Sequence, residues 1–314
     1  MSFSTRIGRR LKLQDLHVLI AVVQAGSMGK AARQLNTSQP NVSKSIADLE
    51  RALGVSLLDR HHEGVEPTEY GRALLDGGVA VFDELRQTVK KIEFLADPAA
   101  GEVRIGSITP LAASFVSAVV DRLSRRYPRI TFDLITGHTG ALHRELEARN
   151  VDLLVVRKFG LPTDQKRDFE FIFDDSFVVV AGMQNPWARK RSVRLTELVN
   201  EPWVMLPSET AAGSVAREVF RISKLDLPRA TVVTGSSEVR FSLLATGRFM
   251  TILSDSALKF PDRRRELKIL PITLPVPSIP NGIVTIKGRT LSPAAQLFIE
   301  YAREVAKSLA KHPR

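Results

Sequence analysis

The sequence of 314 residues contains no cysteine, only two tryptophans and three tyrosines, and no apolar run long enough to span a membrane. Without cysteine the chain can form neither disulfides nor thiolate sites, which agrees with a reducing cytoplasm, where we expect the protein to reside. The first residues, Met1 to Leu13, lack the apolar core of a signal peptide. The sequence therefore predicts neither secretion nor membrane insertion.

Catalytic signatures are absent as well. The chain has no GxSxG motif and no glycine motif that would cradle a phosphate. His138, His143 and Glu147 invite a metal interpretation, because His143 and Glu147 would lie one turn apart on a helix, but no second pair of ligands has matching spacing. We predict no catalytic residue, no metal and no cofactor, and hence a protein that is not an enzyme.

The chain is long and positively charged. Its length suffices for two or three domains, and 45 Lys and Arg against 34 Asp and Glu give a formal charge of +11. A basic chain suits a polyanionic partner, although basic soluble proteins without such a partner are common. The charge alone therefore does not establish what the chain binds.

Residues 27–54 predict two short helices joined by a tight polar turn. The first helix runs from Met28 to Leu35 with Ser27 as its cap, and the second begins after Ser38 and ends before Gly54. The apolar positions of the second helix form one stripe, made of Val42, Ile46, Leu49 and Leu53. A preceding helix over residues 13–25 would pack beneath this pair.

Polar side chains gather at the amino-terminal end of the second helix. Gln39, Asn41, Ser43 and Lys44 lie away from the apolar stripe, where short polar side chains can contact base edges in a major groove. An ordinary helical hairpin with a solvated face is the alternative. The sequence that follows favours the DNA-binding interpretation, because it predicts a β-hairpin wing with Arg60 directed at a phosphate or a minor groove.

The run AARQLNTSQPNVSKSIADLERALGVSLLDR, followed by PTEYG, resembles the DNA-binding end of LysR-type transcriptional regulators. The resemblance implies a bacterial, ligand-responsive transcription factor of α+β multidomain fold, with a winged helix-turn-helix over residues 1–68 and a two-lobed α/β effector domain over residues 98–314. The implied partners are a double-stranded DNA operator, a small-molecule effector and further copies of the chain in a homotetramer made of two dimers, while RNA polymerase is left open. The residues expected to contact DNA are Ser27, Ser38, Gln39, Pro40, Asn41, Ser43, Lys44 and Arg60. Because Asn41 stands where many members have alanine, the base preference at that contact cannot be transferred.

The charge of the DNA-binding region is modest. Residues 1–66 carry nine Lys or Arg and six Asp or Glu, a net charge of +3. Such an excess cannot alone drive tight binding, so the placement of Lys44 and Arg60 must contribute much of the interaction. The basic start of the chain, with Arg6, Arg9 and Arg10, is either a flexible arm near DNA or a solvated tail.

Glu69 to Ala96 follow one long helical pattern without an internal proline, and we assign residues 69–97 to a linker helix. Apolar residues recur at spacings of three and four over roughly four heptads. Such a seam predicts self-association, since a helix-turn-helix module needs a dimer to contact two half-sites. The expected interface residues are Leu75, Phe82, Leu85, Val89 and Ile92. Packing of this helix on its own chain is the alternative.

After the linker, strands and helices alternate, which predicts a parallel α/β lobe followed by a second lobe. Lobe 1 is assigned to about residues 102–173 and 275–314, and lobe 2 to about residues 174–274. Phe171 to Ala181 is expected to be a strand region that crosses into lobe 2, and Leu270 to Pro280 the strand and crossover that return. This layout resembles periplasmic solute-binding proteins as well as the LysR effector domain.

Ligands in this architecture bind at the carboxyl ends of strands and at helix amino termini. Hydroxyl groups at those places suit a carboxylate or a sugar hydroxyl, so we predict an organic acid or a sugar as effector. The candidate residues are Ser107, Thr109, Thr136, His138, Thr139, Pro207, Ser208, Ser236 and Ser237. Each hydroxyl could instead only cap a helix, and Arg157 and Lys158 could either neutralise an acidic ligand or be solvated. The competing function is a solute-binding or enzymatic two-lobed domain whose amino-terminal helices only mediate assembly.

Overall fold

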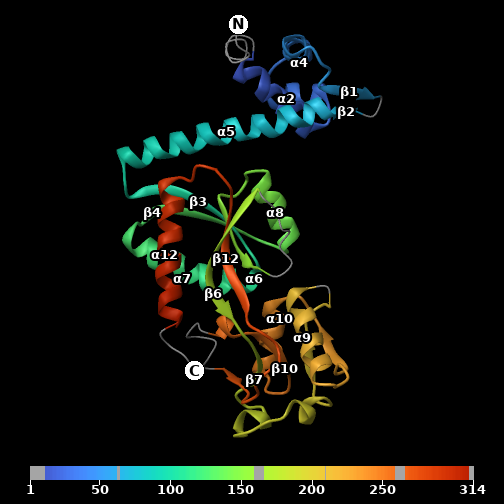
Figure 1. Cartoon of the computed structure of the whole chain (residues 1–314), viewed down its shortest axis with the longest axis vertical. Helices are drawn as coiled ribbons and strands as arrows, with labels where there is room; N and C mark the ends of the chain where they lie inside the picture. The colour runs from blue at the N-terminus through green and yellow to red at the C-terminus, as the bar shows by residue number, and fades with distance from the viewer. Residues whose placement is uncertain (1–10, 62–63, 159–165, 209, 259–265, 311–314) are drawn as a thin grey trace. The chain divides into compact units, whose positions relative to one another are not determined.

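The computed structural model describes residues 11–61, 64–158, 166–208, 210–258 and 266–310, so the arginines at 6, 9 and 10 lie outside the described residues. The chain divides into two compact units, Met1–Val89 and Lys90–Arg314 (Figure 1). No helix in the described ranges is both long and apolar enough to cross a membrane.

The amino-terminal unit is a winged helix-turn-helix from which a long helix begins. Its elements are α2 (Leu13–Ala25), α3 (Met28–Gln34), α4 (Gln39–Leu53), β1 (Leu58–His61), β2 (Gly64–Pro67) and α5 (Glu69–Ala96), of which α5 ends in the second unit. The strands β1 and β2 pair antiparallel, with Arg60 opposite Val65. The four helices begin and end within one residue of the predicted positions.

One core holds this unit together. Leu19, Ile46 and Leu57 are fully buried between α2, α4 and the hairpin. The first half of α5 packs on the same unit, because a β-carbon at Gly78 would approach Leu16 Cδ1 to 2.9 Å, which shows how close the helices lie. Burial of apolar surface therefore fixes the start of the linker helix to the helix-turn-helix.

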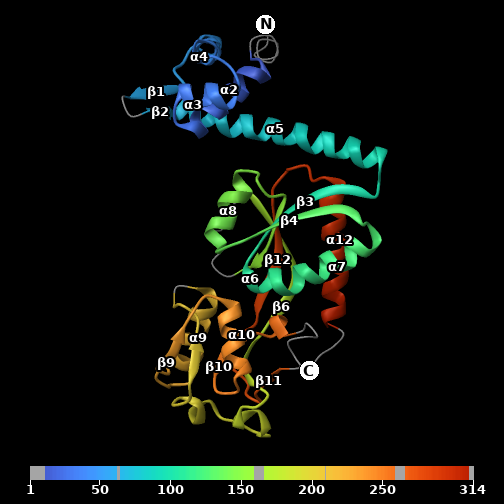
Figure 2. The same ribbon diagram turned by 180° about the vertical axis from the view of Figure 1, so that it is seen from behind.

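Lobe 1 is a five-stranded sheet in the order β4-β3-β5-β12-β6. Its strands are β3 (Ala100–Ser107), β4 (Arg129–Thr136), β5 (Leu153–Arg157), β6 (Arg167–Asp175) and β12 (Ile279–Ile286). Its helices are α6 (Thr109–Leu111), the π-helical turn η1 (Ala112–Val116), α7 (Ser117–Arg126), α8 (Thr139–Glu147) and α12 (Pro293–Ala310). Helices α7 and α12 cover one face of the sheet and α8 the other (Figure 2). Phe298, Ala302 and Val305 on α12 are buried, as the sequence predicts.

Lobe 2 is a second five-stranded sheet, in the order β11-β7-β10-β8-β9. Its elements are β7 (Phe177–Gly182), η2 (Pro186–Arg189), η3 (Leu195–Leu198), β8 (Trp203–Met205), α9 (Ala211–Ile222), β9 (Ala230–Val233), α10 (Ser237–Ala245), β10 (Met250–Ser254), η4 (Asp255–Leu258) and β11 (Leu267–Ile269). Trp203 centres its core, with its ring 5.6 Å from Phe220 and its indole N–H donating to the carbonyl of Leu198 at 2.7 Å.

Two predictions about the strands are wrong and one is confirmed. The sheet of lobe 1 is mixed, because β12 returns from lobe 2 and runs antiparallel to both β5 and β6. Residues 171–181 are the strand region that crosses into lobe 2, since they span the end of β6 and most of β7, which are separated at Ser176. Residues 270–280 are mostly an irregular connection, since proline supplies no N–H to a strand ladder, and β12 begins only at Ile279.

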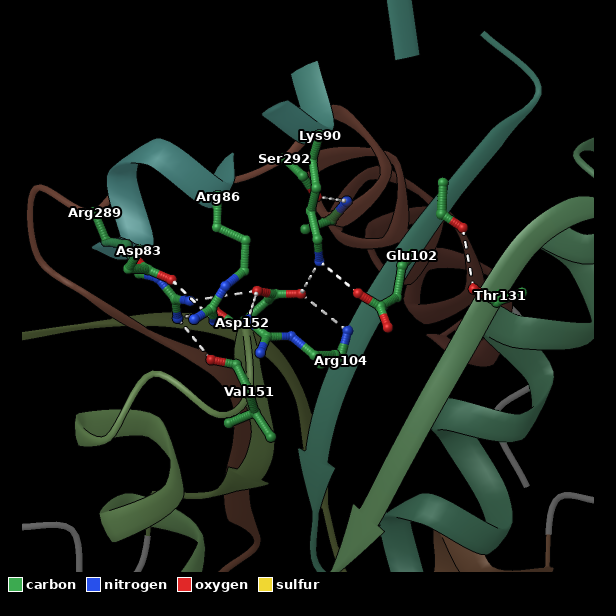
Figure 3. Close-up of polar contacts among 12 residues, drawn as sticks. Asp83, Arg86, Lys90, Glu102, Arg104, Thr131, Val151, Asp152, Arg289 and Ser292 are labelled. Atoms are coloured by element: carbon green, nitrogen blue, oxygen red, sulfur yellow. Dashed lines mark hydrogen bonds and ion pairs between the residues drawn. The ribbon is translucent and has the colours of Figure 1, made fainter. Parts of the chain in front are cut away.

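A buried carboxylate, Asp152, contacts several elements of lobe 1 at the start of β5, the central strand of the sheet (Figure 3). The backbone N–H and the guanidinium of Arg104 on β3 both donate to it at 2.9 Å. Lys90 Nζ on α5 lies 3.7 Å from it and 2.9 Å from Glu102, and Arg289 Nη2 lies 3.3 Å away. Burial raises the pKa of Asp152, but the hydrogen bonds from Arg104 and the charge of Lys90 bring that pKa below its ordinary value of 3.8. The carboxylate is therefore ionised at neutral pH.

Asp152→Asn should lower the free energy of unfolding of the full chain by about 3–5 kcal/mol, because the surrounding cations lose their buried carboxylate. Since the pKa of Asp152 is lower in the folded than in the unfolded chain, its stabilisation is present at neutral pH and is lost as the pH falls through the folded-state pKa. Urea denaturation between pH 7 and pH 3 measures both effects.

Asp121→Asn is the matched control, because Asp121 forms an exposed ion pair with Arg125 at 3.1 Å in the same lobe. Its loss should cost less than about 1 kcal/mol. Equal losses in the two variants would contradict the role given to Asp152.

Candidate functional site

The amino-terminal end of α4 is presented to solvent. Gln39, Pro40, Asn41 and Lys44 are exposed, Ser43 is half-buried, and the stripe on the opposite face is buried at Val42, Ile46 and Leu49. Burial of that stripe fixes the rotation of the helix about its axis. Because the apolar side chains must face the core, the polar side chains on the other side of the helix face solvent.

Two of the predicted DNA-contacting serines are helix caps. Ser27 Oγ accepts the N–H of Lys30 at 3.1 Å, and Ser38 Oγ accepts the N–H of Asn41 at 3.4 Å. Each hydroxyl still carries a hydrogen that can be donated to a phosphate oxygen. The Asn41 amide donates to Thr37 Oγ1 at 3.3 Å, so its orientation is set within the turn.

The wing follows the same unit. Arg60 is exposed on β1, and the hairpin is held to the turn before α3 by the N–H of Val65, which donates to the carbonyl of Gly26 at 3.0 Å. Residues 62 and 63, at the tip of the predicted wing, lie outside the described residues. The wing thus carries its cation on a strand that is fixed to the helix-turn-helix.

A group of buried polar residues lies where the strands of lobe 1 approach lobe 2. Arg157 ends β5 and is 5% exposed, and Asn281 lies directly opposite it on β12, so both side chains lie on one face of the sheet. Asp175 ends β6; it accepts the N–H and the hydroxyl of Ser256 at 3.0 and 2.6 Å. Arg157 Nη2 lies 3.8 Å from that carboxylate. Burial lowers the pKa of Arg157, and Asp175 opposes this effect.

A pocket lies between the two lobes beside this group. Arg157 comes from lobe 1, and Arg240, which is also 5% exposed, comes from α10 of lobe 2. The remaining lining residues are Pro110, Ala113, Ser114, Leu206, Ser237, Phe241, Leu253, Ser254 and Ala257. The cavity volume is about 30 Å³, which is enough for ordered water. Two cations and six apolar residues therefore surround one small enclosed space.

Of the nine residues predicted to bind an effector, Ser237 lines this pocket. Ser107 is fully buried, and its hydroxyl donates to the carbonyl of Val155 at 2.8 Å. Ser236 caps α10 by accepting the N–H of Val239 at 3.2 Å. The residues Thr109, Thr136, His138 and Ser208 are exposed, and Thr139 and Pro207 are half-buried.

His143 and Glu147, whose spacing suits a metal site, instead contact Arg167. His143 Nδ1 lies 2.7 Å from Arg167 Nη1, and the other guanidinium nitrogen of Arg167 donates to Glu147. Burial is the main cause that lowers the pKa of His143, and the charge of Arg167 lowers that pKa further. The charge of Glu147 acts in the opposite direction. Among the described residues no group of three or more His, Asp or Glu could hold a metal ion.

The apolar seam of α5 divides into two parts. Leu75 packs against the core of the helix-turn-helix, and the ring of Phe82 lies 5.7 Å from His17. In contrast, Leu85, Val89 and Ile92 are 45%, 52% and 61% exposed. The predicted self-association interface therefore rests on these last three residues.

Comparison with protein families matches both ends of the chain. Residues 13–72 match the model of the bacterial regulatory helix-turn-helix protein of the lysR family, and residues 96–307 match the LysR substrate binding domain. The chain belongs to the LysR family of transcriptional regulators. The match of the amino-terminal helices to a DNA-binding model argues against the competing view that they only mediate assembly.

Full-length relatives of the LysR family align with nearly the whole chain. The regulator GbpR of Azospirillum brasilense is 25% identical, over 94% of this chain and 86% of its own length. The transcriptional activator CmpR of Synechocystis is 26% identical, over 95% of this chain and 98% of its own. The solved structure of full-length OxyR from Pseudomonas aeruginosa superposes with a TM-score of 0.64 at 21% identity, with 95% of each chain covered. The two-unit fold is thus that of a full-length LysR regulator.

Arg240, Asp175 and Asn281 are not among the predicted site residues, and for Arg157 the sequence leaves open whether it neutralises an acidic ligand or is solvated. Arg157 ends the run LLVV, and a charged residue directly after a buried strand could have been given more weight. Arg240 follows Ser237 by three residues on α10, and its guanidinium donates to the Ser237 hydroxyl at 3.3 Å. The spacing was the signal available in the sequence, because residues three apart lie on the same face of a helix.

Ser107→Ala should lower the free energy of unfolding by about 1–2 kcal/mol, since it removes a buried hydrogen bond to the Val155 carbonyl. Thr109→Val is the control, because Thr109 is exposed, and the change should stay within about 0.5 kcal/mol. Urea denaturation of both variants provides the measurement. A loss of stability confined to the Thr109 variant would reverse the two assignments.

Proposed function

We propose that this LysR regulator binds a double-stranded DNA operator through the amino-terminal end of α4 and the wing, as a homo-oligomer. The observation that carries the proposal is the exposed polar end of α4, which is held in place by its buried apolar stripe and by the Ser38 cap. A helix presented in this way fits the major groove, while Arg60 reaches the phosphate backbone. CbnR, a LysR regulator solved in complex with its target DNA, has the same fold at a TM-score of 0.53 and 21% identity, which supports this arrangement.

The exposed half of the α5 seam supports assembly of two copies. Val81, Leu85, Val89, Ile92 and Leu95 are all exposed, and they recur at spacings of three and four residues along one helix. Water contact of such a stripe is unfavourable, and a second α5 would remove it. Two half-sites require at least two helix-turn-helix units, which supports a dimer. We extend the proposal to a tetramer of two dimers because the family resemblance implies that assembly.

The pocket between the lobes is the proposed effector site. Its walls come from both lobes, so a bound organic acid or sugar would alter how the lobes close and thereby the operator affinity. The protein would act in the cytoplasm as a regulator and not as an enzyme, and RNA polymerase is a further proposed partner at the promoter.

The DNA interface is tested by two pairs of substitutions. Lys44→Ala and Arg60→Ala should weaken binding to all sequences and reduce the salt dependence by about one phosphate contact each. Gln39→Ala and Asn41→Ala should instead cost about 1–3 kcal/mol at particular base pairs and relax specificity there. Fluorescence anisotropy with operator and scrambled duplexes measures the affinity and the specificity of each variant. Titrations from about 50 to about 200 mM salt give the salt dependence.

Arg51→Ala serves as the control, because Arg51 lies at the other end of α4, where it pairs with Asp48 at 2.7 Å. Its operator affinity should match that of the unmodified chain. If Arg51→Ala weakened binding as much as Lys44→Ala, the proposed orientation of α4 on DNA would have to be abandoned.

Leu85→Arg should dissociate the oligomer and abolish operator binding, because an arginine in an apolar interface loses its hydration without gaining a partner. Glu84→Arg places the same side chain on the neighbouring exposed position, outside the stripe, and should leave the assembly intact. Light scattering of both variants decides the matter. An unchanged mass for Leu85→Arg would remove α5 from the interface.

A further inference from the structure

The chemistry of the interlobe pocket is more specific than its position. Its lining contains two arginines and no acidic residue. Asp175 pairs with one of them, since its carboxylate lies 3.8 Å from Arg157 Nη2, and it also accepts two hydrogen bonds from Ser256. Two guanidinium groups against this one neighbouring carboxylate leave an excess of positive charge at the pocket.

Buried polar atoms beside the pocket have no hydrogen-bond partner among the described residues. In the described part of the chain, no acceptor lies within hydrogen-bond distance of Arg157 Nε, although that atom is buried. Asn281 is fully buried opposite Arg157, and among the described residues its amide nitrogen has no acceptor and its amide oxygen no donor. Buried groups of this kind normally bind water or a ligand, because a buried polar atom without a partner destabilises the fold.

From these observations we infer that the effector is a short aliphatic dicarboxylate, with one carboxylate on Arg157 of lobe 1 and the other on Arg240 of lobe 2. A guanidinium donates two parallel hydrogen bonds to a carboxylate, so each arginine suits one end of such a molecule. The amide N–H of Asn281 and the hydroxyl of Ser237 are the neighbouring donors. This inference rests on the proposed effector site and names the class of ligand that it takes.

The apolar walls favour a carbon skeleton over an inorganic anion. Three serines and two arginines supply the donors of the lining, whereas the other six residues offer no donor side chain, and phosphate or sulfate would need donors around all of its oxygens. The cavity as it stands has room only for water, so a ligand requires the lobes to separate, and a chain of few carbon atoms requires the least separation. Since the two cations come from different lobes, a dicarboxylate can hold the lobes together, and a monocarboxylate can satisfy one lobe only.

The test is isothermal titration calorimetry of the full chain with succinate as the probe. Malonate and glutarate vary the length, butyrate removes one charge, and inorganic phosphate represents a compact anion. We expect succinate or a neighbour in length to bind, and butyrate and phosphate to bind at least about tenfold more weakly. Tighter binding of phosphate, or equal binding of butyrate, would overturn the inference.

Substitutions locate the binding. Arg157→Met and Arg240→Met should each weaken binding of the dicarboxylate about tenfold to hundredfold. Arg157→Lys keeps the charge without the planar fork and should fall between these variants and the unmodified chain. Arg144→Met, on the exposed face of α8, is the control and should bind normally. Circular dichroism identifies any variant that fails to fold. If Arg157→Met does not fold, the binding affinity of Arg157→Lys tests the role of Arg157 instead. Normal binding by both methionine variants would overturn the inference.

Operator binding with and without succinate separates this inference from the proposed function. Dicarboxylate binding that depends on both arginines but leaves operator affinity unchanged would support the site and refute its regulatory role. A neutral sugar that shifts operator affinity and requires Ser237, in a chain that binds no dicarboxylate, would refute the inference and leave the proposed function standing.

Discussion

The antiparallel pairing of β6 with β12 is the constraint on which the effector unit depends. The chain leaves lobe 1 at Asp175, at the end of β6, and returns at Ile279, at the start of β12, and these two residues are directly opposite each other. Both crossings are therefore made at one place by hydrogen-bonded neighbours. Ile279 also belongs to the core of lobe 2, so the pair is fixed on both sides. Any change in the relative position of the lobes must therefore be taken up at these two crossings.

The polar residues of the pocket are attached to that strand pair or to its neighbour. Asn281 lies on β12 at an irregularity in the pairing with β6, and Gly282 follows, where a β-carbon would approach the carbonyl oxygen of Glu170 to 2.4 Å. Such irregularities redirect side chains, and they are common beside binding sites. Arg157 pairs with Asn281 from the other side, and Asp175 reaches Ser256 of lobe 2. A ligand that engages Arg157 thus acts next to the point about which the lobes move.

The sequence predicted the amino-terminal unit almost residue by residue, because its signals are local. Ser27 and Ser38 cap helices within three residues of themselves, and the stripe of α4 is read from spacing alone. The position of the interlobe pocket depends on contacts between distant residues. Arg157 and Asn281 are more than a hundred residues apart in the chain and become neighbours only because β12 inserts beside β5. No periodicity within either segment records that pairing, and the prolines before β12 obscured the strand itself.

Ser107 shows how a sound rule for locating ligand sites can select a hydroxyl that is already used within the fold. Ser107 does follow a strand of lobe 1, as the rule for ligand sites in α/β sheets requires. Its hydroxyl, however, is fully buried and donates to the Val155 carbonyl, so it satisfies the sheet and has no donor left for a ligand. Arg157 stands at the corresponding end of β5 with more donors than its neighbours can accept. Strand ends identify the region in both cases, but unsatisfied hydrogen-bonding capacity decides which side chain can bind a ligand.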